Sequence, residues 1–323
     1  MTDSNAEPLD EFGLIARYFD RPAGDASVVL GPGDDAALIE PTQTLAMSTD
    51  TLNAGVHFLD DIDPARLGER ALAVNLSDMA AMGAQPRWFL LSLTLARTQA
   101  SWLEGFAAGL HACAQRYGVS LIGGDVTGGA LAMSIHILGE VPRTQALLRS
   151  GAACGDAVFV TGTLGDAAAG LRLAGEKRDD DADKRWLIDR YELPTPRVAA
   201  GIALRGIATA AIDVSDGLLA DLGWICKASG CAADVDVAAV PLSAPLSRRE
   251  SLGQARRFAL SGGDDYELCF TAPGQAEERV RGALAQVGVA VTRIGECRAG
   301  HGVHCRLDGR PYAAGSGGFA HFS

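Results

Sequence analysis

The chain has 323 residues, 48% of them hydrophobic, and this length exceeds one ordinary core and predicts two domains. Its formal net charge of -12 argues against nucleic acid or an anionic membrane surface as a partner. No apolar stretch has the length of a membrane span, the N-terminus is polar and acidic, and the seven cysteines include no Cys-x-x-Cys pair. We therefore expect a reduced, cytoplasmic protein.

Helices and strands are expected to alternate through the first half of the chain. Apolar spacing predicts helices over 12–19, 63–82 and 101–117, and strands over 28–30, 36–39, 45–50, 88–95, 119–122 and 131–141. Asp63 followed by Pro64 is typical of a helix start, because Asp caps free N–H groups and proline suits the first helical position. The pattern breaks over 142–156, which predicts an N-terminal domain, 1–148, and a C-terminal domain, 149–323.

The second half shows the same mixture of elements. Strands are expected over 157–160, 210–212, 266–271 and 289–294, and helices over 166–173 and 218–228. The charge-dense segment 176–184 is interpreted as a solvated loop. Both halves therefore indicate an α/β (α+β) protein of two domains.

Aspartates framed by Gly, Ser and Thr recur along the chain, mostly after apolar runs. They are Asp34 and Asp35, Asp50, Asp78, Asp125, Asp213 and Asp216, and Asp264 and Asp265. Carboxylates gathered at the ends of buried strands would be poorly solvated and would repel one another. Divalent cations remove both penalties, and Mg²⁺ prefers carboxylate and hydroxyl oxygens. One such acid alone would be a turn or cap residue, but six such sites indicate a phosphate site with several metal ions.

The local surroundings of three of these sites support that interpretation. Asp78 falls four residues beyond Val74 and should project with the apolar stripe of its helix. Asp50 ends its strand beside the hydroxyls of Ser48 and Thr49. The run 213–217 brackets Ser215 with two acids at a strand-to-helix turn, and we expect the free N–H groups of the helix that follows to be available to phosphate.

Other common chemistries are excluded by the sequence. The chain has three lysines, Lys177, Lys184 and Lys227, and none lies in a glycine-rich turn, so it has no P-loop and no kinase strand-lysine arrangement. The turn 161–166 lies where an anion could bind a helix N-terminus, but it lacks the full GxGxxG pattern and is interpreted as a simple strand-to-helix turn. GxSxG and HExxH motifs are also absent.

Three further residues have both a functional and a structural interpretation. His57 near apolar neighbours is typical of a packed histidine. Arg149 suits bidentate phosphate binding or an ion pair between domains. Phe319, in a glycine-rich tail, either packs the C-terminus or stacks on a cationic ring.

Taken in order, these motifs resemble the thiamine-monophosphate kinase family over nearly the whole chain. The matching segments are 12–19, 33–37, 48–52, 73–84, 122–125, 212–218 and 261–268. The resemblance implies the two-domain fold of the aminoimidazole ribonucleotide synthetase-like superfamily, with an N-terminal domain that dimerises through its sheet. It also implies an ATP site, several Mg²⁺ ions, a homodimer, and transfer of the γ-phosphate of ATP to thiamine monophosphate.

The resemblance also implies roles for individual residues. Metal ligands would be Asp35, Ser48, Thr49, Asp50, Asp78, Asp125, Asp213 and Asp216. Nucleotide would contact Gly124, Asp125, Arg149 and Ser215, and substrate would contact His57, Asp264 and Phe319. Asp125, Asp216 and Arg149 would assist the transfer itself. Similar enzymes often have Glu at the position of Asp264, so this chain keeps the charge with a shorter reach.

Three alternatives stay open at the level of the sequence. One is an ATP-dependent ligase such as aminoimidazole ribonucleotide synthetase, which the block 48–52 with His57 argues against. Selenophosphate synthetase is disfavoured because no cysteine precedes Cys113. A scaffold that binds nucleotide without turnover would differ from a kinase in forming no thiamine diphosphate.

Overall fold

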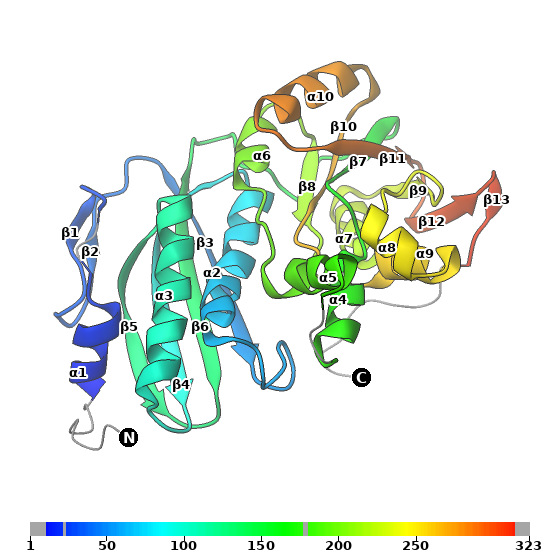
Figure 1. Ribbon diagram of the computed structural model, residues 1–323. Coiled ribbons are helices and arrows are strands. Elements are labelled where there is room, and N and C mark those ends of the chain that lie inside the picture. Colours follow the sequence, from blue (N-terminus) through cyan, green and yellow to red (C-terminus); the bar gives the residue numbers. More distant parts are fainter. Residues whose placement is uncertain (1–10, 22–23, 177–179, 314–323) are drawn as a thin grey trace. The chain divides into compact units, whose positions relative to one another are not determined.

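The structure, a computed structural model, describes residues 11–21, 24–176 and 180–313, which fold into two compact units (Figure 1). The N-terminal unit comprises 1–75 and 86–140, and the C-terminal unit comprises 76–85 and 141–323. The division at 140/141 lies slightly before the boundary expected at 148, and the segment 76–85 belongs to the second unit although it lies within the first half of the sequence. Among the described residues, no helix has both the length and the apolar character to cross a membrane.

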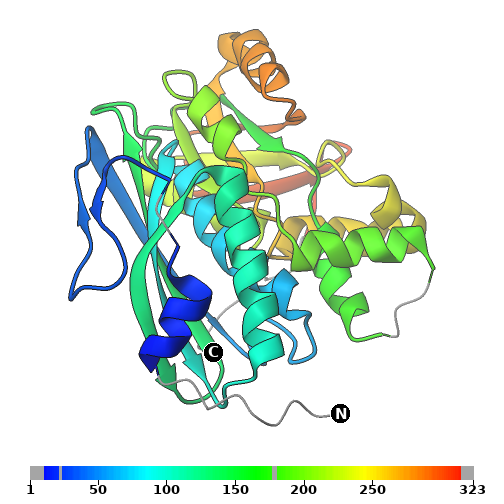
Figure 2. The same ribbon diagram turned by 60° about the vertical axis from the view of Figure 1, so that its left-hand side comes forward.

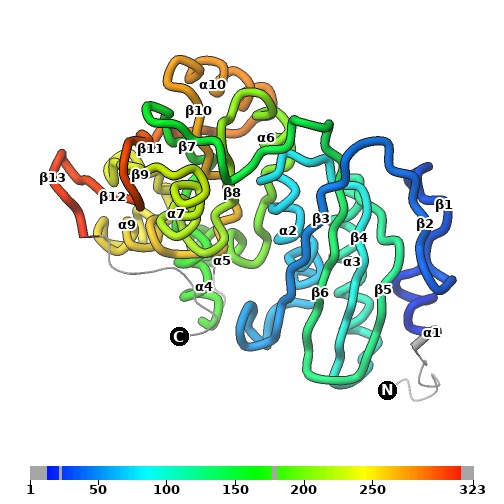
Figure 3. Tube along the Cα trace, turned by 180° about the vertical axis from the view of Figure 1, so that it is seen from behind, coloured from blue at the N-terminus to red at the C-terminus, as the bar shows by residue number. Residues whose placement is uncertain are grey.

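The N-terminal unit is built on a four-stranded sheet in the order β3-β6-β4-β5. Its strands are β3 (Thr44–Asn53), β4 (Gln85–Leu95), β5 (Ser120–Gly128) and β6 (Ala132–Val141), and its helices are α1 (Glu11–Leu14), the π-helical turn η1 (Ile15–Phe19), α2 (Pro64–Ala81) and α3 (Ala100–Tyr117). Helices α2 and α3 run along one face of this sheet (Figures 1 and 2). Seen from behind, the strands lie in front of these helices (Figure 3). Asp63 accepts hydrogen bonds from Ala65 and Arg66, which confirms the expected cap of α2.

A short hairpin of β1 (Val28–Leu30) and β2 (Leu38–Ile39) is tied to this sheet by a charged cluster. Arg87 on β4 donates two hydrogen bonds of 2.9 Å to the Asp25 carboxylate and one of 2.8 Å to Glu140 on β6. Apolar side chains of the hairpin also pack against Trp88. The cluster therefore anchors the hairpin whose turn carries the motif 33–37.

The C-terminal unit contains a seven-stranded sheet in the order β13-β12-β9-β11-β7-β10-β8. The strands are β7 (Asp156–Thr161), β8 (Ala210–Asp213), β9 (Ala232–Asp236), β10 (Leu268–Pro273), β11 (Val291–Arg298), β12 (Gly302–Leu307) and β13 (Arg310–Pro311). Neighbouring strands are antiparallel except β12 and β9, which are parallel. Its helices are α4 (Asp166–Ala174), α5 (Ala182–Glu192), α6 (Val198–Ala203), α7 (Leu218–Ser229), α8 (Ala244–Arg249), α9 (Leu252–Ser261) and α10 (Glu277–Gln286), with the 3-10 turn η2 (Gly274–Ala276).

The expected loop over 176–184 is wrong at its C-terminal end, where α5 begins. Asp181 caps that helix by accepting a hydrogen bond from the backbone N–H of Lys184. Leu187, Ile188 and Tyr191 are buried along it, so tertiary packing stabilises a helix whose exposed face is charged.

Candidate active site

A cavity of about 1240 Å³ in the N-terminal unit gathers several of the predicted site residues. Asp35 lies in the β1–β2 turn, Ser48 and Thr49 on β3, and Gly124 and Asp125 on β5, and all five line the cavity. Asp34 joins them, together with apolar residues of β4 and β6. Three segments that are distant in sequence therefore bring oxygen atoms to one cavity. Asp50 and His57 are not among the residues that line it.

Asp125 lies inside strand β5, whereas the apolar run that ends at Ile122 had predicted a position just after the strand. Strand β5 continues through 123–125 and pairs in parallel with β4, so that Gly124 lies beside Leu91 and Asp125 beside Ser92. Gly124 has a φ of 155°, and a Cβ there would collide with the main-chain oxygen of Leu91. Glycine is therefore required for the close approach that places Asp125 in the cavity.

The hydroxyl of Thr49 lies on the sheet face opposite to Ser48 and Asp50. Side chains alternate along a strand, and Thr49 Oγ1 lies 2.7 Å from Nδ1 of His136 on β6. Ser48 and Asp50 instead share the register of the buried residues Ala46 and Leu52. Helix α2 holds the main chain of Asp50, because the Asp50 N–H donates a hydrogen bond of 3.1 Å to Oδ1 of Asn75 on that helix.

His57 lies in the turn after β3, where it is held by the backbone. Its Nδ1 accepts a hydrogen bond of 3.0 Å from the N–H of Asn53. In the neutral imidazole the proton is therefore on Nε2. Asp78, on α2, is half-buried within a run of buried helix positions, in line with the expected apolar side of the helix.

The acids of the run 213–217 are organised by Asp221, a residue that sequence reasoning missed. Oδ2 of Asp221 accepts hydrogen bonds from the N–H groups of Ser215, Asp216 and Gly217, at 3.0, 3.1 and 3.1 Å. The N–H groups of the turn itself are therefore occupied by the chain's own carboxylate, whereas phosphate contact with the N–H groups of the helix that follows, α7, stays a prediction. Burial, with added repulsion from Asp213 and Asp216, raises the pKa of Asp221 to about 7.

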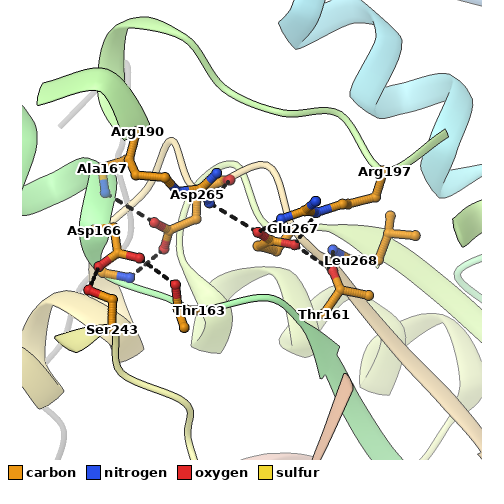
Figure 4. Close-up of polar contacts among 11 residues, drawn as sticks. Thr161, Thr163, Asp166, Ala167, Arg190, Arg197, Ser243, Asp265, Glu267 and Leu268 are labelled. Carbon is orange, nitrogen blue, oxygen red and sulfur yellow. Dashed lines mark hydrogen bonds and ion pairs between the residues drawn. The ribbon is translucent and has the colours of Figure 1, made fainter. Parts of the chain in front are cut away.

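A second internal carboxylate occupies the N-terminus of α4 (Figure 4). Asp265 accepts hydrogen bonds from the N–H groups of Gly165, at 2.7 Å, and Ala167, at 3.2 Å. The interpretation of 161–166 as a strand-to-helix turn is thus confirmed, and the anion at this helix end belongs to the protein. Complete burial raises the pKa of Asp265 well above its ordinary value.

Glu267 forms the other half of this buried network (Figure 4). Its carboxylate receives hydrogen bonds from Arg190 at 3.0 Å, from both Nε and Nη2 of Arg197 at 2.6 and 2.5 Å, and from Thr161 at 2.7 Å. The motif 264–268 therefore contains acids of two kinds. Asp265 and Glu267 are buried and bonded within the protein, whereas Asp264 is half-buried.

The remaining predicted residues lie elsewhere or outside the described structure. Arg149 has an exposed side chain, and its main-chain oxygen accepts a hydrogen bond from Ser229. Phe319 lies outside the described residues. In the part of the chain that the structure describes, no group of three or more His, Cys, Asp or Glu side chains is arranged to hold a metal ion by itself.

The two halves of the chain match the N-terminal and C-terminal domain models of one protein family. Residues 33–141 match the family model described as AIR synthase related protein, N-terminal domain, and residues 153–308 match the model of its C-terminal domain. The chain belongs to this family, and within it to the thiamine-monophosphate kinases. The thiamine-monophosphate kinase of Salmonella typhimurium is 52% identical over 97% of this chain and 98% of its own length.

Solved structures give the same result. The crystal structure of thiamine-monophosphate kinase from Stenotrophomonas maltophilia has a TM-score of 0.85 and 44% identity, covering 90% of this chain and 93% of that one. AaThiL complexed with AMPPCP and TMP has a TM-score of 0.77 and 34% identity, covering 90% of this chain and 91% of that one. The expected two-domain fold and the expected family are both confirmed.

Proposed function

We propose that this chain transfers the γ-phosphate of ATP directly to the phosphate of thiamine monophosphate, giving thiamine diphosphate and ADP. The observation that carries the proposal is the similarity, over nine-tenths of the chain, to a protein solved with AMPPCP and TMP together. The cavity lined by Asp35, Ser48 and Asp125 supports it with oxygen donors of the kind that a phosphate–metal site needs.

The donor set fits Mg²⁺ bound together with nucleotide. Mg²⁺ commonly takes one or two carboxylates and completes its shell with water and substrate phosphate oxygens. Such a site needs no cage of three protein acids, and none is found among the described residues. When bound, the ions would neutralise the phosphates that must approach each other. We propose as ligands Asp35, Ser48, Thr49, Asp50, Asp78, Asp125, Asp213 and Asp216, with Thr49 acting through its main-chain oxygen because its hydroxyl is bonded to His136.

Some backbone N–H groups of the C-terminal unit that could have bound phosphate are bonded to the chain's own carboxylates. At the turn 213–217 and at the start of α4, backbone N–H groups bind Asp221 and Asp265. These particular N–H groups are therefore not free to bind phosphate. We propose that Arg149 adds a positive charge, and that Gly124 and Ser215 contact the nucleotide.

The acceptor needs no general base from the protein. The second pKa of a phosphate monoester lies near ~6, so the acceptor is mostly dianionic at neutral pH. Positioning and charge neutralisation then supply the catalysis. On the acceptor side we propose His57, Asp264 and Phe319.

We further propose that the active form is a cytoplasmic homodimer joined through the N-terminal sheet. Met47 on β3 has a 68% exposed side chain, and Thr49 and Thr51 share its side of the strand by alternation. All seven cysteines are free, which suits a reducing compartment. Met47→Arg should shift the mass measured by light scattering from dimer to monomer, and a wild-type monomer would reject this assembly.

Product analysis tests the function against its rivals. Purified protein with ATP, Mg²⁺ and thiamine monophosphate should form thiamine diphosphate and ADP in equal amounts, and neither without metal. ADP and inorganic phosphate without thiamine diphosphate would favour a ligase-type reaction. Nucleotide binding without any product would favour a scaffold.

A further inference from the structure

The segment 264–266 contains two strained residues next to the buried network of Figure 4. Asp264 has a φ of 66° and Tyr266 a φ of 49°, and they are two of only four non-glycine residues with positive φ in the described ranges. Asp tolerates this region, whereas a bulky tyrosine there is an outlier. Glycine would adopt the same backbone without strain, so the side chains are retained for what they do. Strain of this kind clusters at functional sites.

The surrounding structure holds this conformation from two sides. The N–H groups of Asp264 and Tyr266 donate to the main-chain oxygens of Ser215 and Val214, at 2.8 and 2.9 Å. The alternate residues, Asp265 and Glu267, are fully buried in hydrogen bonds to α4, α5 and the residue before α6. The segment is therefore fixed before any ligand arrives.

The side chains of the two strained residues are joined to each other. Tyr266 Oη donates a hydrogen bond of 3.1 Å to Asp264 Oδ1, and the tyrosine is 9% exposed. A carboxylate held by a buried phenol loses little rotamer freedom on binding a ligand. This matters most for Asp264, whose side chain is one methylene shorter than a glutamate.

We propose that Tyr266 is a positioning residue for acceptor recognition, whose hydroxyl orients the Asp264 carboxylate toward the cationic heterocycle of the acceptor. This role rests on the proposed function, in which Asp264 lies on the acceptor side. It adds a specificity element that acts through Asp264 and leaves the nucleotide side unchanged.

The first test is Tyr266→Phe, which removes one oxygen and preserves the ring. The KM for thiamine monophosphate should rise about ten- to a hundredfold, as expected for one lost hydrogen bond to a charged group. The KM for ATP and the melting temperature should stay close to wild type. Tyr312→Phe, a half-buried tyrosine near the end of the described chain, is the matched control and should change neither KM.

A double-mutant cycle separates positioning from a merely structural role. Asp264→Gly removes the carboxylate without backbone strain, because the positive φ suits glycine. If Tyr266 acts through Asp264, Tyr266→Phe should add nothing to the acceptor KM of the Asp264→Gly variant. Additive effects, or an unchanged acceptor KM in Tyr266→Phe alone, would overturn the role of Tyr266 while the proposed function stands. A wild-type protein that forms no thiamine diphosphate would reject the proposed function, and this role with it.

Discussion

The hydroxyl of Ser77 donates a hydrogen bond of 2.6 Å to Oδ2 of Asp213, and both side chains are buried. The bond joins the residue before Asp78 on α2 to the last residue of β8, so it connects two of the aspartate motifs. Ser77 therefore fixes the orientation of the Asp213 carboxylate, which we propose as a cation ligand.

Replacing Ser77 with Ala should weaken cation binding. The buried Asp213 carboxylate would lose a donor, at a cost of about 1–3 kcal/mol. The Mg²⁺ concentration at half-maximal activity should rise several-fold. Titration of activity with Mg²⁺ measures this, and Ser134→Ala, at a serine paired with the exposed Thr51, is the control. An unchanged Mg²⁺ dependence in a less stable Ser77→Ala protein would make Ser77 purely structural.

Asp221 should be much more sensitive to Ala than to Asn. Asn keeps an acceptor oxygen for the N–H groups of Ser215, Asp216 and Gly217, whereas Ala leaves all three without their partner. Urea unfolding should show Asp221→Ala less stable than Asp221→Asn by about 2–3 kcal/mol. Equal losses would show that the hydrogen bonds of this turn are not what Asp221 contributes.

Thr49 and Ser48 should respond differently to loss of their hydroxyls, because alternation places them on opposite faces of β3. Thr49→Val should change turnover by less than about threefold, since its hydroxyl is bonded to His136. Ser48→Ala should weaken Mg²⁺-dependent activity on the order of tenfold, as expected near a metal site. Steady-state kinetics of the two variants decide the point, and the reverse order would place the proposed ligands on the other face of the sheet.

Acid stability should depend on the Arg87–Asp25 pair. The hydrogen bond from Arg87 lowers the pKa of Asp25 from its ordinary 3.8 to about 2. A carboxylate with a lowered pKa stabilises the fold above the unfolded pKa, and this contribution disappears as the pH falls through the folded pKa. The Asp25 side chain is 13% exposed, so the pair should contribute about 1–2 kcal/mol that is lost between about pH 4 and pH 2.

The variant Arg87→Gln should remove most of this pH dependence. Urea midpoints measured between pH 2 and pH 5 should fall less steeply than in the wild type. Arg248→Gln, which breaks the exposed pair with Asp183, serves as the control and should leave the curve unchanged. Parallel curves for wild type and Arg87→Gln would show that another group governs acid unfolding.

Local signals in the sequence were enough to place many elements. The Asp63-Pro64 start of α2 and the apolar run of β3 depend on short-range chemistry, and both are found close to the expected positions. Helix α5 was missed because its exposed face is charged and its stability comes from buried contacts of Leu187 and Tyr191. Strand β5 was ended too early because its apolar run stops at Ile122.

The residues of the candidate site show even more clearly what local sequence patterns cannot predict. Residue type and neighbours indicated the aspartates, and the structure gathers Asp35 and Asp125 in one cavity of the N-terminal unit. The roles of Asp221 and Asp265 depend on which backbone N–H groups each carboxylate reaches. For Asp265 those groups lie about a hundred residues away, and no local pattern encodes that pairing. An acid in the first turn of α7 was the one signal that pointed to Asp221.

The central claim is direct transfer of the γ-phosphate between two phosphates, and the fate of a label on that group tests it most directly. ATP labelled at the γ-phosphate should pass its label to the terminal phosphate of thiamine diphosphate in a Mg²⁺-dependent reaction, with little label in inorganic phosphate. Asp125→Asn should fold normally and slow the transfer by orders of magnitude. Label that appears in inorganic phosphate while thiamine monophosphate stays unchanged would contradict the claim.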